Sequence, residues 1–559
     1  MTLKIRLSLI LAILGLSLSI ALTKAGILQL VRGPALKELA ERQHTRTTQY
    51  SNFRGDIVDR KGRLLATSVG VHSLYAEPRR MNHPDQVAKV LKQAVPSLSH
   101  IQLERLSSDR SFVWLSRRLD PNISQRVQDL KLEGIGISSE EQRFYPNHGL
   151  LGQTLGSVSI DGKSIGGIEQ AFVRYLKPKT WDTLSLQDAR GKPIRSYFAP
   201  DQEDLWGDKI TLTIDRNIQF IAEEVLSQTV QAHGARGGWA IVMRPKTGEI
   251  LALATVPLMN PNKPEKNSTA SRNNPISRTG EPGSTFKIVT FAAAFDLGLL
   301  QPDEKIYCEK GIWKLDHVTI RDVSKKEFLT PTEIFQYSSN IGTYKIAQRV
   351  GKEKLYEMIK RLGFGELPGL NLLEEAKGFV SKPESWGQAR FVNVSFGYGI
   401  MASSLQMATM VSTIANGGIK VAPQILKNIQ KTNGEIYNPL PTYKPTRVLS
   451  EQAAKALTQM MIHDTQGDGS GKRAAIPGIL VAGKTGTAEK LDASGHYAKN
   501  LNLSSFAGFA PADNPEIVAL VTIDEPKGIA FGGYVAAPAW RQIVEAALIQ
   551  LNNTVEDQP

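Results

Sequence analysis

The chain has 559 residues, with 67 Lys and Arg against 54 Asp and Glu, which gives a formal net charge of +13. Hydrophobic residues make up 41% and charged residues 22%, so disordered, collagen-like and low-complexity classes are excluded. At about 150 residues per domain, the length predicts two or three domains. Cys308 is the only cysteine, which excludes an intramolecular disulfide and cysteine-rich zinc modules.

The N-terminus predicts a membrane anchor. Lys4 and Arg6 precede an uncharged run, Leu7–Thr23, whose seventeen residues cover about 26 Å of helix. That length is short for a bilayer core, and the apolar residues 26–31 extend it. The alternative is a cleaved signal peptide, but no small-x-small cleavage site follows the run. We therefore interpret residues 1–31 as a short cytoplasmic tail and an uncleaved transmembrane helix, with the bulk of the chain outside.

After the anchor, the sequence pattern predicts two domains with a boundary near Gly207. Residues 32–50 carry charged side chains at helical spacing and predict a polar helix. From residue 51 to about 206, short alternating apolar runs separated by Gly, Pro and Asn predict a mixed α+β module. Residues 32–206 are thus expected to form one domain, and residues 207–552 a second, larger one, followed by a flexible tail over 553–559.

The larger domain is predicted to be an antiparallel sheet sandwiched by helices. Asp215 is placed to cap a helix over Ile218–Val230, and Pro245–Gly248 is a hairpin turn. Further helices are expected from Pro282 to Gly298 and over Trp540–Leu551. The expected strands are Lys209–Ile214, Gly238–Arg244, Glu249–Thr255, Gly478–Ala482, Phe506–Ala510 and Ile517–Ile523.

The first motif whose side chains are suited to catalysis is Ser284-Thr285-Phe286-Lys287, directly after Glu281-Pro282-Gly283. Residues i and i+3 lie on one helical face, so the serine hydroxyl and the lysine amine can meet. Serine needs a base to become a nucleophile, and lysine is a base only when burial or a nearby cation lowers its pKa. Taken alone, the motif also fits an ordinary helix.

The second motif is Ser338-Ser339-Asn340, 54 residues later. A second hydroxyl beside an amide is suited to relay protons and to hold a peptide carbonyl, although a polar helix cap gives the same letters. Ser271-Arg272-Asn273 matches the pattern too, but it precedes Ser284 in a polar, loop-like stretch.

The third motif, Lys484-Thr485-Gly486 followed by Thr487, is predicted to end the apolar strand. Lys484 is placed to anchor a carboxylate and to keep Lys287 neutral. Gly486 would let a substrate backbone approach, and the backbone N–H groups of Thr487 and Ser284 would form an oxyanion hole. Lys246-Thr247-Gly248 has the same letters but lies in the predicted hairpin turn.

In this order the three motifs resemble those of the penicillin-recognising serine acyltransferases. Ser339 stands where class A β-lactamases have Asp, which is more similar to a transpeptidase. Segments similar to class B penicillin-binding proteins are Arg54–Gly62, Arg143–Pro146, Gly166–Glu169, Ser395–Gly399 and Gly532–Pro538. The resemblance therefore runs from about residue 50 to about 545, and it implies that residues 32–206 are a non-catalytic pedestal. Arg54, Asp56, Asp59 and Arg60 are interpreted as part of an ion network there.

The resemblance implies a peptidoglycan D,D-transpeptidase. Ser284 would attack the penultimate D-Ala carbonyl of a stem pentapeptide, and Lys287 would take its proton. Ser338 would pass a proton to the leaving amine, and Asn340 would hold the acyl side-chain amide. β-Lactams would acylate the same serine.

Substrate binding is implied for Lys484 and Thr485, at the terminal carboxylate, and for Tyr398 and Phe531, along the groove. Glu281-Pro282-Gly283-Ser284-Thr285 is more similar to the division type, a penicillin-binding protein 3-like enzyme, than to the elongation type. The compact length suits a Gram-negative cell, with the chain in the inner membrane and its bulk in the periplasm. A membrane glycan polymerase and divisome proteins are the implied partners.

Other functions have less support in the sequence. There is no basic run of five or six residues and no nucleic-acid motif, so no nucleic acid partner is expected. The nine histidines form no His-Glu-x-x-His, and neither a metal nor a cofactor is expected. An elongation-type transpeptidase, a β-lactamase and a catalytically silent β-lactam-binding sensor or scaffold remain alternatives. A class A enzyme would need a glycosyltransferase domain of about 200 residues in the space that the class B motifs occupy.

Overall fold

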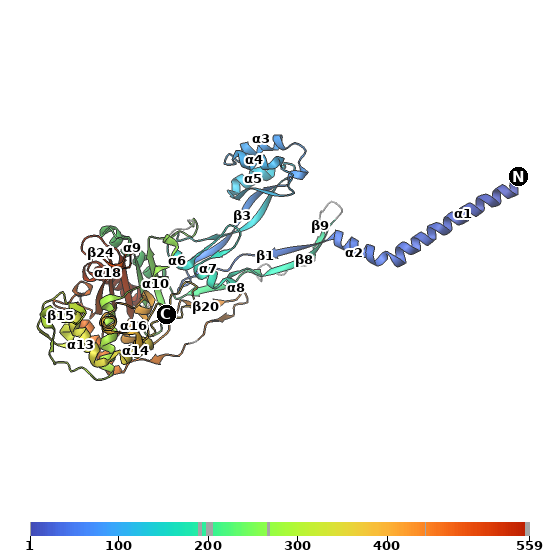
Figure 1. Ribbon diagram of the computed structural model, residues 1–559. Coiled ribbons are helices and arrows are strands. Elements are labelled where there is room, and N and C mark those ends of the chain that lie inside the picture. Colours follow the sequence, from blue (N-terminus) through green and yellow to red (C-terminus); the bar gives the residue numbers. More distant parts are fainter. Residues whose placement is uncertain are drawn as a thin grey trace. The chain divides into compact units, whose positions relative to one another are not determined.

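The computed structural model describes residues 2–187, 193–196, 205–264, 269–441, 443–492 and 494–553 (Figure 1). The chain divides into two compact units. The first comprises Met1–Phe53 and Lys177–Gly207, and the second comprises Arg54–Leu176 and Asp208–Pro559. Most of the predicted tail, residues 554–559, lies outside the described residues.

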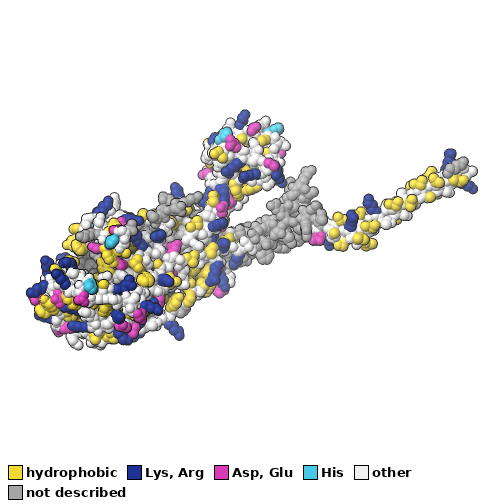
Figure 2. All heavy atoms as spheres, viewed as in Figure 1, with side chains coloured by type: hydrophobic (Ala, Val, Ile, Leu, Met, Phe, Trp, Pro, Cys, Tyr) yellow, Lys and Arg dark blue, Asp and Glu magenta, His cyan; other side chains and the backbone are white. Residues whose placement is uncertain are grey.

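The first unit begins with an apolar helix. Helix α1 (Leu3–Gly26) continues into a π-helical turn, Ile27–Val31, and the 29 residues form a helix long and apolar enough to cross a membrane. None of its side chains is buried, and Figure 2 shows hydrophobic side chains along its surface with basic residues at its start. This arrangement is consistent with a single-pass anchor.

The rest of the first unit is a short helix and a small sheet. Helix α2 covers Gly33–His44, and strand β1 (Thr45–Ser51) pairs antiparallel with β8 (Thr180–Gln187), which in turn pairs with β9 (Pro193–Ser196). The predicted helix over residues 32–50 is therefore wrong beyond His44. The residues after it are rich in threonine, which favours a strand, and the partner strand is about 130 residues away in sequence.

The second unit contains a seven-stranded sheet in the order β21-β20-β10-β2-β3-β4, with β5 also paired to β3. These strands are β2 (Ile57–Val58), β3 (Leu64–Ala76), β4 (Val113–Leu119), β5 (Ile135–Phe144), β10 (Lys209–Leu212), β20 (Leu426–Gln430) and β21 (Ile436–Tyr437). The short helices α3 (Pro84–Ala94), α4 (His100–Glu104) and α5 (Pro121–Asp129) share a separate core with β3 and β4. Strands from both sides of Gly207 therefore meet in one sheet.

The motif Lys484-Thr485-Gly486 lies in a five-stranded antiparallel sheet in the order β12-β11-β25-β24-β23. Its strands are β11 (Gly237–Met243), β12 (Ile250–Val256), β23 (Ala482–Leu491), β24 (Tyr497–Ala510) and β25 (Ile517–Asp524). Alternate residues enter two different cores. Those on one face share a core with α9 (Arg216–Ala232) and α18 (Gly532–Asn552). Those on the other share a core with α11 (Lys287–Asp296), α13 (Asn340–Val350), α16 (Ser404–Ala415) and α17 (Glu451–Thr465). The predicted sheet between helices is confirmed.

Several predicted boundaries are corrected. The strand predicted over Gly478–Ala482 is wrong, because the strand begins at Ala482 and pairs with β24 through the glycine and threonine residues that follow. Strand β10 ends at Leu212, before the predicted Ile214, and β24 begins nine residues before Phe506. Helix α18 begins at Gly532, before the predicted start at Trp540. It contains Pro538, and proline usually interrupts a helix, so the sequence pattern did not indicate the earlier start. Asp215 caps α9 as predicted, through bonds from the backbone N–H groups of the first turn.

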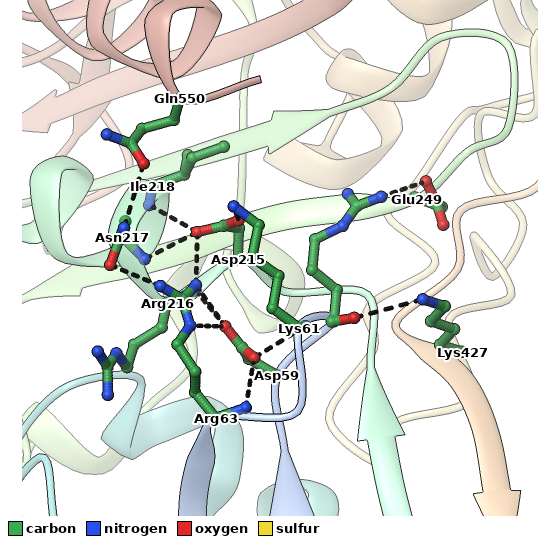
Figure 3. Close-up of polar contacts among 11 residues, drawn as sticks. Asp59, Lys61, Arg63, Asp215, Arg216, Asn217, Ile218, Glu249, Lys427 and Gln550 are labelled. Carbon is green, nitrogen blue, oxygen red and sulfur yellow. Dashed lines mark hydrogen bonds and ion pairs between the residues drawn. The ribbon is translucent and has the colours of Figure 1, made fainter. Parts of the chain in front are cut away.

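Ion pairs join the loop after β2 to the start of α9 (Figure 3). Arg63 donates to Asp59 Oδ2 at 2.7 Å, to Asp215 Oδ1 at 2.9 Å and to Asn217 Oδ1 at 2.8 Å. Asn217 donates in turn to Gln550 on α18 at 3.1 Å. Arg63 thus connects the loop directly to α9, and through Asn217 to α18.

A second group of ion pairs is fully buried. Glu169 accepts from Arg54 Nε at 2.6 Å and from Arg143 Nε at 2.7 Å, and the three side chains are at most 3% exposed. Arg60 pairs with Glu249, whereas Asp56 forms no ion pair with any residue that the structure describes. The ion network expected from the sequence is present for Arg54, Asp59 and Arg60, and it leaves Asp56 out.

Glu223 makes the stability of this unit depend on pH. It lies buried on α9, where it accepts from Leu151 N at 2.8 Å and Gln219 Nε2 at 2.7 Å, and burial raises its pKa to about 7. Its folded-state pKa lies above the unfolded one, so ionisation favours unfolding. The stabilising contribution is present at low pH and is lost as pH rises through about 7.

Glu223→Gln should therefore lose less stability than the wild type between pH 5 and pH 8. The measurement is the thermal unfolding midpoint of the full chain in detergent at both pH values. Glu224→Gln, at the exposed neighbouring position, is the matched control. Equal pH dependence in wild type and both variants would contradict the assignment.

Candidate active site

The nucleophile lies in a tight turn that glycine contacts make possible. Gly283–Phe286 forms a 3-10 turn that leads into α11. Gly283 has φ +56° and donates its N–H to Gly397 O at 3.1 Å. A Cβ atom on Gly397 would lie 2.2 Å from Gly283 O, so the segment Ser395–Gly399 requires glycine at this position. Ser284 is half-buried, and its hydroxyl has no hydrogen-bond partner within the described part of the chain.

Lys287 is the buried base candidate beside Ser284. It has no exposed surface, and its Nζ donates to Ser338 O at 2.5 Å and to Ser338 Oγ at 3.0 Å. Ser338 has φ +56°, an uncommon conformation for a residue other than glycine. This conformation occurs between α12 (Pro331–Gln336) and α13, where it turns both oxygens of Ser338 toward the lysine. The structure therefore brings the first two motifs together.

Asp322 organises the second motif, and the sequence analysis missed it. Ser339 Oγ donates to Asp322 Oδ2 at 2.5 Å, while the N–H groups of Asn340 and Ile341 donate to Oδ1 at 2.6 and 3.1 Å. The Asn340 side chain donates to Arg321 O at 3.0 Å. A carboxylate at a helix N-terminus is a common cap, but its place 18 residues upstream gave no local signal.

Lys484, Thr485 and Gly486 lie inside strand β23, not after a strand as predicted. A Cβ atom on Gly486 would lie 2.4 Å from Ser505 Oγ and 2.9 Å from Thr285 Cγ2. The glycine therefore permits close packing of the strand against its neighbour and the nucleophile turn, which is a different reason from the one expected. Thr487 Oγ1 accepts from Gly532 N at 3.0 Å, which ties the strand to the start of α18.

Lys484 has two polar partners that the sequence analysis missed, the buried Asp464 and the exposed Ser470. Lys484 and Asp464 have no exposed surface, and Lys484 Nζ lies 3.4 Å from Asp464 Oδ1. Ser470 Oγ donates to the same oxygen at 2.8 Å and lies 2.6 Å from Thr485 Oγ1. Burial raises the pKa of Asp464, and Lys484 opposes this shift.

The electrostatics favour the neutral form of the Lys287 amine. Burial lowers the pKa of Lys287, and the nearby Lys484 cation lowers it further. The carboxylates of Asp322 and Asp464 act in the opposite direction, but the pKa remains well below its ordinary value. An uncharged amine one helical turn after a serine is suited to general-base activation of its hydroxyl.

Two aromatic residues were predicted to line the groove. Tyr398 is half-buried, and its ring centroid lies 5.5 Å from that of Tyr497. Tyr497 OH donates to Glu281 Oε1 at 3.1 Å, and Gly399 N donates to the same oxygen at 2.7 Å, so both tyrosines lie near the nucleophile turn. Phe531 is 54% exposed and precedes α18. Their predicted contact with substrate stays a prediction.

The competing motifs have structural explanations. Lys246-Thr247-Gly248 lies in the hairpin turn between β11 and β12, as predicted. The side chain of Asn273 is buried and donates to Thr154 Oγ1 at 3.2 Å.

Cys308 is buried, with its Sγ 3.5 Å from Ile306 O. Across the described ranges, no three His, Cys, Asp or Glu side chains are grouped so that they could hold a metal ion.

Two family models match the chain. The model described as penicillin binding protein transpeptidase domain matches residues 238–545, more than half of the chain, and the model described as penicillin-binding protein dimerisation domain matches residues 51–212. The chain belongs to the class B penicillin-binding proteins. It is a serine-type peptidoglycan D,D-transpeptidase, because the transpeptidase model covers all three motifs and the relatives carry this activity in their names.

The relatives of this class B penicillin-binding protein match it over nearly their full length. The probable peptidoglycan D,D-transpeptidase PenA of Neisseria meningitidis is 32% identical, covering 93% of this chain and 88% of the relative. The peptidoglycan D,D-transpeptidase FtsI of Escherichia coli is 30% identical, covering 96% and 90%. Penicillin-binding protein 3 of Mycobacterium tuberculosis, solved in complex with aztreonam, has a TM-score of 0.70 at 28% identity, covering 90% and 97%.

Lys484→Gln tests the electrostatic account of Lys287. Removing the cation raises the pKa of Lys287, so the amine stays protonated to a higher pH and the acid limb of β-lactam acylation should move to higher pH. The plateau rate should fall by about 10- to 100-fold, because a charge-assisted hydrogen bond to the ligand is lost. The measurement is the pH profile of the acylation rate, with exposed Lys472→Gln as control. An acid limb that stays in place would contradict the account.

Proposed function

We propose that this enzyme cross-links stem peptides of the septal cell wall through an acyl-enzyme on Ser284. The observation that carries the proposal is the fully buried Lys287, which has a lowered pKa and lies one turn after a serine hydroxyl with no partner among the described residues. The base, the nucleophile and a second hydroxyl then occupy one site, as acyl transfer requires.

Acylation follows from these positions. Ser284 Oγ attacks the penultimate D-Ala carbonyl carbon while Lys287 takes the hydroxyl proton. The N–H groups of Ser284 and Thr487 stabilise the oxyanion. Ser338, which already accepts from Lys287, carries a proton to the amine of the leaving D-Ala. The C–N bond breaks, and an ester on Ser284 remains.

Deacylation uses the same groups in the opposite sense. The amine of a neighbouring stem peptide gives up a proton and attacks the ester carbonyl, a 4→3 peptide cross-link forms, and the Ser284 oxygen regains its proton.

Substrate binding before acylation is assigned to residues around this site. Lys484 and Thr485 bind the terminal carboxylate of the donor peptide, and Asn340 holds its acyl amide. Tyr398 and Phe531 line the groove. A β-lactam acylates Ser284 by opening its ring, so its amine stays tethered and the ester persists.

The septal role is supported by the relatives' names and by the sequence before the nucleophile. FtsI of Escherichia coli and stage V sporulation protein D of Bacillus subtilis, which is 31% identical, both match along most of the chain. The apolar helix α1 suits an inner-membrane anchor with the remainder in the periplasm. A class B enzyme has no polymerase domain of its own, so a membrane glycan polymerase and divisome proteins are the proposed partners.

Ser284→Ala should abolish covalent labelling by a fluorescent penicillin, because it removes the hydroxyl that is proposed to form the ester. The measurement is in-gel fluorescence of the full chain in membranes, with persistence followed over many minutes. Ser271→Ala, which changes the serine of the look-alike triplet, should label as the wild type does. Labelling that survives Ser284→Ala would contradict the mechanism, and a label that decays rapidly would favour a β-lactamase.

Depletion of the protein in its host tests the septal role. Cells should grow into filaments with septa blocked, because only septal cross-linking is removed. The measurement is cell length and shape by microscopy, with complementation by wild type but not by Ser284→Ala. Rounded cells would favour the elongation type, and rescue by Ser284→Ala would favour a scaffold.

A further inference from the structure

Asp464 is a buried carboxylate that the mechanism above does not use. It is the penultimate residue of α17 and lies directly beneath strand β23, with no exposed surface. Its Oδ1 accepts from Ser470 and Lys484, but its Oδ2 has no hydrogen-bond partner among the residues that the structure describes. The backbone of Gly471 closes over this oxygen, since a Cβ atom there would lie 2.8 Å from it.

Asp464 fixes the direction of a chain of hydroxyl groups that ends at Thr485. Ser470 Oγ lies 2.8 Å from Asp464 Oδ1 and 2.6 Å from Thr485 Oγ1. A hydroxyl has one hydrogen, and an ionised carboxylate can only accept. Ser470 therefore gives its hydrogen to Asp464, and the hydrogen in the short contact with Thr485 comes from Thr485. This hydrogen then points at Ser470 rather than at a ligand.

Asp464 also opposes the charge of Lys484. The three N–H groups of Lys484 have acceptors in Asp464 Oδ1 at 3.4 Å, Ser470 Oγ at 3.3 Å and Thr485 Oγ1 at 3.4 Å. Both members of the ion pair are completely buried, where charges interact more strongly than in water. The negative charge of Asp464 therefore partly offsets the attraction between Lys484 and a negatively charged ligand.

We propose that Asp464 is a positioning residue that weakens recognition of the ligand carboxylate by Lys484 and Thr485. It does so by drawing the Thr485 hydrogen away through Ser470 and by offsetting the lysine charge. The inference rests on the proposed function, in which the ligand is the terminal carboxylate of a stem peptide or the carboxylate of a β-lactam. The ligand carboxylate must therefore compete with Asp464 for the Lys484 ammonium group and the Thr485 hydroxyl group.

Two variants separate the two contributions. Asp464→Asn removes the charge and keeps an acceptor for Ser470, whereas Ser470→Ala cuts the hydroxyl chain and keeps the ion pair. Ser470 is exposed, so its substitution leaves the core intact even if Asp464→Asn fails to fold. Asp468→Asn is the matched control, because it makes the same change at an exposed position of the same loop.

The probes are benzylpenicillin and its uncharged methyl ester, and the measurement is the ratio of their rates of acylation of Ser284 in the full chain. Any change in Lys287 acts on both probes and cancels in the ratio. We expect the ratio of acid to ester to rise about tenfold in Asp464→Asn, equivalent to about 1.4 kcal/mol, and about threefold in Ser470→Ala. It should stay at the wild-type value in Asp468→Asn.

The outcomes distinguish this inference from the proposed function. A ratio that is unchanged or lower in Ser470→Ala, or in a folded Asp464→Asn, would overturn the role of Asp464. A wild-type chain that is not acylated on Ser284 by either probe would instead contradict the proposed function itself.

Discussion

The burial of two lysines close to each other is the constraint on which the rest of the active site depends. Lys287 and Lys484 both have no exposed surface, and each comes from a different element, α11 and strand β23. Burial disfavours the charged form of Lys287, and the neighbouring Lys484 cation disfavours it further. Lys484 keeps a carboxylate partner in Asp464, whereas the acceptors of Lys287 among the described residues are the neutral oxygens of Ser338. This difference supports Lys287 as the proposed base and Lys484 as the proposed anion-binding group.

Close backbone packing keeps these two elements together. The turn that carries Ser284 contacts Gly397 on one side and lies against Gly486 of β23 on the other. The start of α18 contacts the same strand, since a Cβ atom on Gly532 would lie 2.3 Å from Gly486 O. Side chains at these glycine positions would push the strand away from the nucleophile, and the distance between the two lysines would change with it.

The sequence predicted what is local and missed what is brought together by folding. Ser284, Lys287 and Lys484 could be proposed as site residues because each motif is three or four residues long and the motifs occur in a fixed order. The cap at Asp215 and the hairpin at Pro245–Gly248 were found for the same reason.

Asp322, Asp464 and Ser470 were missed, because the motif residues that they contact are between 14 and 20 residues away and no spacing rule links them. The start of α18 was missed because Gly532, Gly533 and Pro538 discourage a helix locally, and packing on β24 and β25 overrides that preference. The end of α2 was missed because strand β1 depends on a partner, β8, that is distant in sequence.

The most direct test of the central claim is the ionisation of Lys287 itself. Lysines labelled with carbon-13 at Cε, in the full chain in detergent, report their protonation through the chemical shift. Lys287→Arg assigns the resonance. The account predicts one lysine signal that titrates well below the ordinary lysine range and is lost in Lys287→Arg. A Lys287 signal that titrates with the exposed lysines would contradict it, because the amine would then be charged at neutral pH and unable to activate Ser284.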